Sequence, residues 1–130
     1  MQMAWDKKYE VGNERIDFEH HIFLDLVTSF SDKIAQGASK EQMLRLLKEI
    51  GKYADFHFTS EENMMIDSSY PDMDRHAELH ALLIADLHDI TGRFSSEHLA
   101  AKEVFDFLFQ WFALHTSQED KLLALHINSR

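Results

Sequence analysis

The sequence contains no cysteine, which excludes disulfide bonds, thiolate zinc sites, iron–sulfur clusters and a cysteine nucleophile. It has only 4 glycines and 1 proline, which leaves little material for the many tight turns of an all-β fold. No apolar run approaches the roughly 18 residues that a membrane span requires. The first residues also lack the basic region and apolar run of a secretory signal. These absences predict a cytoplasmic protein built from helices.

Positive charge is also in short supply. The chain carries 13 basic and 23 acidic residues, for a net charge of −10. We expect neither nucleic acid nor a membrane as a partner, because both need a basic surface that displaces counterions. With 130 residues, 45% of them hydrophobic, residues 1–130 are expected to form one domain with one core. Against this background, 9 histidines in so short a chain stand out.

Four stretches place apolar residues three and four positions apart, which is the spacing of one helical face. We expect helices over about 13–34, from a capping box at Ser39 and Gln42 to about residue 66, over 72–90, and from about residue 95 onward. Thr91-Gly92 is expected to end the third. The predicted fold class is all-α: an up-down-up-down antiparallel four-helix bundle, with the first dozen residues as an N-terminal arm.

Polar residues interrupt the apolar face of every predicted helix. A single inward histidine is more often a core residue bonded to the backbone, and Glu61 alone could be the exposed member of a Glu-Glu pair. Burying the whole set without partners would cost about 1–3 kcal/mol for each group, too much for a bundle stable by about 5–15 kcal/mol. A bound metal removes this cost, because it is a partner that all the groups share. The set is His20, His57, Glu61, His76, His80, His115 and Asp120.

The ligand types limit the choice of metal. Five imidazoles and two carboxylates are too many for one tetrahedral zinc, and calcium or magnesium prefers oxygen throughout. Imidazole with carboxylate suits iron, copper, nickel or zinc, and bridging carboxylates suit a pair of ions. The inward positions lack the Glu-x-x-His pairs of ferritin-like bundles, so the predicted site is richer in nitrogen and poorer in negative charge.

In order and spacing, the motifs that carry these residues resemble hemerythrin in its bacterial form. The motifs are Ile16-Asp17-Phe18-Glu19-His20, His57-x-x-x-Glu61, His76-x-x-x-His80 and His115-x-x-x-x-Asp120. The resemblance covers nearly the whole chain, including Trp5 and Val11-Gly12 in the arm. It implies two iron ions with an oxo or hydroxo bridge and dioxygen as the ligand.

The resemblance also implies a role for each ligand. His76, His80 and His115 would bind one iron, and His20 and His57 the other. Glu61 and Asp120 would bridge the two irons. The second iron, with one ligand fewer, would keep an open position where dioxygen binds and is reduced to a hydroperoxide.

Residues beside the expected ligands are predicted to wall an apolar pocket for dioxygen. Leu24 and Trp111 each lie four positions from an expected ligand, and Phe58 is next to one. All three are more often simple core residues, but a dry wall would favour reversible binding. The remaining histidines are assigned to the surface or to helix ends; they are His21, His88, His98 and His126.

The spacing of His115 and Asp120 conflicts with a regular helix. Five residues turn an α-helix by about 500°, so Glu119 would face the same side as His115 better than Asp120 does. A single i→i+5 widening would bring Asp120 back over His115, and such bulges occur mostly at functional sites. We therefore expect a widening between His115 and Asp120, with Asp120 inward and Glu119 outward.

The predicted function is reversible dioxygen binding at a non-haem diiron centre, without enzymatic turnover. It would serve oxygen carriage or storage, or oxygen sensing as one domain of a longer chain with a C-terminal output domain. The alternatives are a diiron oxidase or ferroxidase, which generally needs more carboxylates, and a purely structural bundle.

Overall fold

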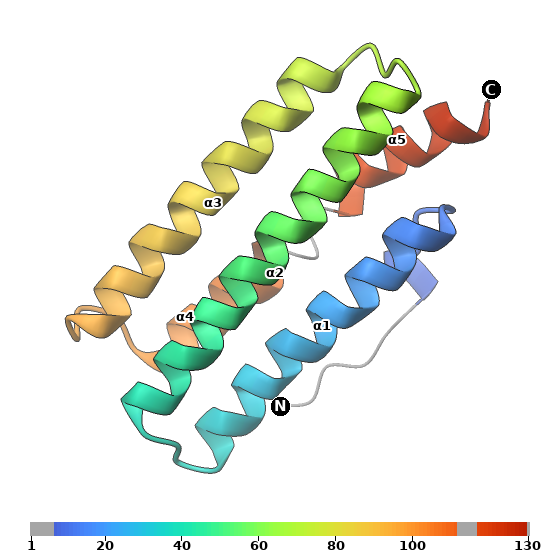
Figure 1. Cartoon of the computed structure of the whole chain (residues 1–130). Coiled ribbons are helices and arrows are strands. Elements are labelled where there is room, and N and C mark those ends of the chain that lie inside the picture. Colours follow the sequence, from blue (N-terminus) through green and yellow to red (C-terminus); the bar gives the residue numbers. More distant parts are fainter. Residues whose placement is uncertain (1–6, 112–116, 130) are drawn as a thin grey trace.

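The computed structural model describes residues 7–111 and 117–129, and this part of the chain is helical with no strand. A short 3₁₀ helix, η1, precedes five α-helices; the elements are η1 (Lys7–Tyr9), α1 (Glu14–Ala35), α2 (Lys40–Asp67), α3 (Met73–Ser95), α4 (Ala101–Gln110) and α5 (Ser117–Asn128). The first three α-helices run alternately up and down, and α4 and α5 together occupy the fourth position (Figure 1). The all-α bundle predicted from the sequence is confirmed. None of the described helices is long and apolar enough to cross a membrane.

Side-chain caps fix where the first two helices begin. Asn13 Oδ1 accepts a hydrogen bond of 3.0 Å from the backbone N–H of Ile16 and starts α1. Ser39 and Gln42 form the predicted capping box: Ser39 Oγ accepts from Gln42 N at 3.1 Å, and Gln42 Oε1 accepts from Ser39 N at 3.0 Å. Both helices therefore begin at the predicted positions.

The predicted boundary between the third and fourth helices is wrong. Helix α3 continues through Thr91-Gly92 to Ser95, because Phe94 is buried in the core and extends the apolar face by one more turn. The chain turns at Glu97, where φ is +66°. Helix α4 then begins at Ala101, several residues after the predicted start at Ser95-Ser96-Glu97.

The described part of the arm, residues 7–12, lies against the bundle, as its apolar residues predict. Tyr9 joins the main core between the long helices, and Val11 joins a smaller apolar cluster. That smaller cluster holds α5 in place and consists of Val11, Ile16, Met65, Tyr70, Leu123 and Ala124. Asp17 accepts hydrogen bonds from the backbone of Val11 at 2.7 Å and of Gly12 at 3.3 Å. Trp5 lies outside the described residues.

Polar contacts also attach α5 to the rest of the bundle. Half-buried His126 places Nε2 2.8 Å from the carbonyl oxygen of Ser68 at the end of α2. Asn128 donates to the carbonyl oxygen of Gly12 at 3.1 Å. His126 lies in the last turn of α5, at a helix end as expected, and there it also fastens α5 to the end of α2.

Candidate metal centre

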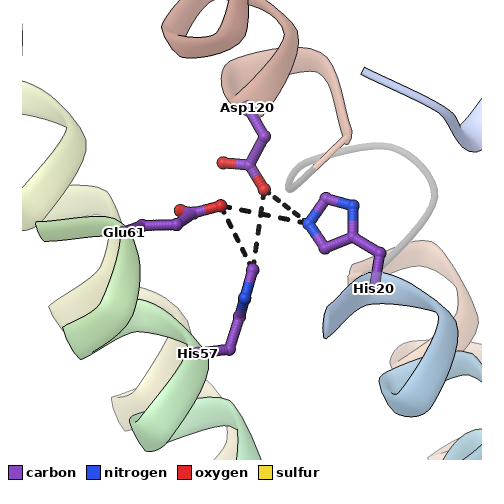
Figure 2. A group of neighbouring side chains, drawn as sticks. All are labelled: His20, His57, Glu61 and Asp120. Atoms are coloured by element: carbon purple, nitrogen blue, oxygen red, sulfur yellow. Dashed lines mark hydrogen bonds and ion pairs between the residues drawn. The ribbon is translucent and has the colours of Figure 1, made fainter. Parts of the chain in front are cut away.

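Six of the seven predicted site residues come together in the interior, and none is more than 4% exposed. They project from four helices: His20 from α1, His57 and Glu61 from α2, His76 and His80 from α3, and Asp120 from α5. Figure 2 shows four of them, His20, His57, Glu61 and Asp120, pointing toward one another. The seventh, His115, lies outside the described residues.

Glu61 stands between two groups of histidines. Its Oε2 lies 3.2 Å from His57 Nε2 and 3.9 Å from His20 Nε2. Its Oε1 lies 3.0 Å from His80 Nε2 and 3.3 Å from His76 Nε2. Each oxygen of this carboxylate therefore faces a different pair of imidazoles.

Asp120 repeats this arrangement from the opposite helix. Its Oδ2 lies 2.7 Å from His20 Nε2 and 3.7 Å from His57 Nε2. Its Oδ1 lies 3.2 Å from His76 Nε2. The residues consequently form two potential metal sites that share both carboxylates: His20 and His57 on one side, His76 and His80 on the other.

Several polar atoms at the centre fit metal ligation better than they fit one another. Within the described residues, His57 Nε2, His76 Nε2, Glu61 Oε2 and Asp120 Oδ1 are buried without a hydrogen bond of good geometry. Buried polar groups are normally satisfied, and leaving one unsatisfied costs about 1–3 kcal/mol. Imidazole nitrogens and carboxylate oxygens are ligands that iron accepts. The residues present therefore fit a pair of iron ions.

Two further carboxylates orient the histidines, and the sequence prediction gave them no role. Glu19 Oε1 lies 2.7 Å from His57 Nδ1, and Glu62 Oε2 lies 2.9 Å from His80 Nδ1. A hydrogen bond from Nδ1–H leaves Nε2 with its lone pair toward the centre, which is how metal-binding histidines are usually held. Glu19 also accepts from Ser60 Oγ at 2.9 Å. Helical spacing could have identified Glu19, because it shares the inward stripe of α1 with Ile16, His20 and Phe23.

In the metal-free chain, the mutual approach of these groups shifts their proton affinities. Burial disfavours the charged imidazole of His57, but Glu61, Asp120 and Glu19 outweigh this and raise its pKa well above the ordinary value. Burial opposes charge at His76 too, yet Asp120 and Glu61 raise its pKa to about 9. Burial would raise the pKa of Asp120, whereas hydrogen bonding to His20, His57 and His76 holds it well below the usual range. The raised pKa values of the imidazoles and the lowered pKa of Asp120 thus have one cause, the close approach of histidines and carboxylates in the interior.

The structure distinguishes Asp120 from its neighbour Glu119. Asp120 is 1% exposed and faces the histidines, as Figure 2 shows. Glu119 lies on the outer side of α5, where Arg75 Nη2 donates to it at 2.6 Å and Arg75 Nη1 at 3.2 Å. Trp111, directly after α4, has π-helical backbone geometry. The widening predicted between His115 and Asp120 falls partly on residues 112–116, outside the described part of the chain.

The three apolar residues that were expected to wall the dioxygen position are all buried. Leu24, Phe58 and Trp111 are buried in the same core cluster. The Phe58 ring stacks on the imidazole of His80, with centroids 3.9 Å apart and planes 11° apart. The Trp111 ring packs on Phe58 with centroids 5.5 Å apart. These contacts give the His80 side of the centre an aromatic neighbour in Phe58, which Trp111 supports.

A helical bundle whose interior holds two histidine groups bridged by two carboxylates is a metal-binding protein of the dinuclear class. The family model for the hemerythrin HHE cation binding domain matches residues 11–125, and the chain belongs to the hemerythrin family, whose members bind dioxygen at a diiron centre. The chain is 32% identical to a myohemerythrin of Theromyzon tessulatum over 76% of this chain and 78% of that protein. It is 27% identical to a bacteriohemerythrin of Methylococcus capsulatus over 82% and 81% of the two chains. A bacteriohemerythrin of Pseudomonas aeruginosa is 24% identical over 91% and 76%.

Proposed function

We propose that this chain holds two irons in the centre described above and binds dioxygen reversibly. The observation that carries the proposal is the placement of Glu61 and Asp120, each of which directs its two oxygens at different histidine groups. One iron would be held by His20 and His57, and the other by His76, His80 and His115. Glu61 and Asp120 would bridge them.

The two irons would supply the electrons and the open coordination position that dioxygen requires. The chain's own residues would determine whether bound dioxygen is released or consumed. Glu19 and Glu62 hold the imidazoles of His57 and His80 in a fixed orientation. Leu24, Phe58 and Trp111 would wall the position with apolar side chains and keep water away. A dry, nitrogen-rich centre with only two bridging carboxylates favours binding and release over oxidation of a second substrate. We propose carriage or storage of dioxygen as its use.

The test is iron loading followed by gas exchange. The protein should hold two irons per chain, and the reduced form should take up dioxygen in air and release it under vacuum. Azide should compete for the same position in the oxidised form. His57→Ala should abolish dioxygen binding, whereas His98→Ala should leave it unchanged, because His98 is exposed and its ring hydrogen-bonds Ser96 Oγ, away from the centre. One zinc per chain, or continuous dioxygen consumption with release of an oxidised product, would contradict the proposal.

A further inference from the structure

A groove runs along the surface between α2 and α3, outside the ligand cluster. Its volume is about 580 Å³, within the range of about 300–1,000 Å³ that small-molecule sites occupy. Four apolar side chains line it: Leu44 and Leu47 from α2, and Ile84 and Leu87 from α3. The groove is therefore large enough, and apolar enough, to take the hydrocarbon part of a ligand.

Both glycines that occur inside helices lie on this groove. They are Gly51 in α2 and Gly92 in α3. Glycine in a helix interior lowers stability relative to alanine, so the presence of glycine at each of these positions calls for an explanation. Neither has a positive φ; a Cβ on Gly51 would meet only Leu87 Cδ2 at an ordinary 3.7 Å, and a Cβ on Gly92 would meet nothing within 4 Å. Backbone conformation and internal packing do not require these glycines, and what they share is the open space above them.

The rim of the groove carries positive charge on an acidic molecule. Lys48 and Lys52 are four residues apart on α2, so their side chains emerge about 5–6 Å apart on one face. Neither forms an ion pair with any residue in the described part of the chain. His88 faces them from α3, while the carboxylate of Asp55 lies one turn beyond Lys52. An anionic group would be attracted to the lysines and repelled from the Asp55 end.

We propose that the α2–α3 groove binds an anionic amphiphile of the fatty-acid class. The hydrocarbon chain would lie over Gly51 and along the leucines, and the carboxylate would sit between Lys48 and Lys52. The apolar lining, the space left by the two glycines and the unpaired lysines together define this ligand. None of the groove residues is a proposed iron ligand, so this proposal can be tested separately from dioxygen binding.

Calorimetric titration of the iron-loaded protein with decanoate, kept below its micellar concentration, tests the site. We expect saturable binding of one decanoate per chain. Acetate supplies the charge without the apolar chain and should not bind detectably, and decanol supplies the chain without the charge and should bind at least tenfold more weakly. Absence of saturable decanoate binding would overturn the proposal.

Variants locate the binding. Gly51→Leu fills the groove and should abolish decanoate binding while iron content and helical circular dichroism stay unchanged. The double variant Lys48→Gln, Lys52→Gln should weaken decanoate at least tenfold and leave decanol unaffected. Lys102→Gln, an exposed lysine on α4, is the matched control and should bind as the parent does. Decanoate binding that survives Gly51→Leu would place the ligand elsewhere. Dimerisation that Gly51→Leu prevents, without decanoate binding, would assign the groove to a second copy; both outcomes refute the site.

Discussion

At the scale of single residues, two adjacent carboxylates of α5 point in opposite directions. Asp120 faces the buried histidines, and Glu119 pairs with Arg75 on the outer side. Both positions carry a carboxylate. Regular helical spacing favoured Glu119 as the inward residue, whereas the family motif favoured Asp120. Spacing and motif therefore disagreed, and only the contacts of the two side chains in the folded chain separate them.

The first prediction compares these two carboxylates. Asp120→Ala removes the group that faces both histidine pairs, and we expect the protein to lose most of its iron. Glu119→Ala removes only the exposed contact with Arg75 and should keep two irons per chain, with at most about 1 kcal/mol of lost stability. Metal analysis of the two purified variants decides between them. Retention of both irons by Asp120→Ala together with their loss in Glu119→Ala would reverse the assignment.

The second prediction concerns Glu19, which touches His57 on the side away from the centre. Glu19→Ala removes the acceptor for His57 Nδ1 and should lower metal affinity by about 10–100-fold, the usual cost of losing such a partner. Glu19→Gln keeps an acceptor oxygen and should recover part of that loss. Glu14→Ala, an exposed change at the start of the same helix, serves as the control. Competition with a chelator measures the affinities, and equal affinities for Glu19→Ala and Glu14→Ala would deny Glu19 this role.

At the scale of elements, the sequence predicted the features that depend on neighbouring residues along the chain. The start of α1, the capping box at Ser39 and Gln42, and the inward stripes follow from spacing and side-chain chemistry. The end of α3 does not, because burial of Phe94 outweighs the tendency of Gly92 to end a helix. The attachment of α5 does not follow either, because His126 and Asn128 bind the carbonyl oxygens of Ser68 and Gly12, which are far away in the sequence.

The third prediction contrasts two glycines at helix positions of different geometry. Gly92→Ala adds a methyl group where nothing lies within 4 Å and should raise the free energy of unfolding by about 0.5–1 kcal/mol. Gly37 follows the end of α1 with φ of +68°, so Gly37→Ala should lower it by about 1 kcal/mol. Urea denaturation gives both values. A destabilising Gly92→Ala would mean that α3 needs glycine for its own geometry.

At the scale of the whole molecule, the stability of the metal-free chain should depend on pH through the buried cluster. The pKa of His76 is about 9 in the folded chain against an ordinary 6.5, so its protonated form stabilises the fold fully below pH 6.5 and progressively less as pH rises through 9. The depressed pKa of Asp120 has the opposite sign: its contribution is present above the ordinary 3.8 and is lost as pH falls below it.

The fourth prediction follows from the directions of these two pKa shifts. The free energy of unfolding of the metal-free chain should be highest between about pH 4 and 6.5 and should fall toward pH 9, as urea titrations at a series of pH values would measure. Metal binding should release protons, because the imidazoles must be deprotonated to act as ligands. His98→Gln should give the same curve as the parent, since His98 is exposed. A metal-free chain whose stability rises steadily from pH 6.5 to 9 would contradict the coupling.

The two ends of the described chain meet at one pole of the bundle, where Asn128 donates to the carbonyl oxygen of Gly12. The red α5 and the blue start of α1 lie at the same end in Figure 1. Tension applied between these ends would peel α5 from α1 and, within about two turns of helix, would reach the contact of His20 with Asp120. The metal centre would then be the first strong cross-link in the path of the force. Mechanical resistance of the molecule should accordingly be set by whether that centre is filled.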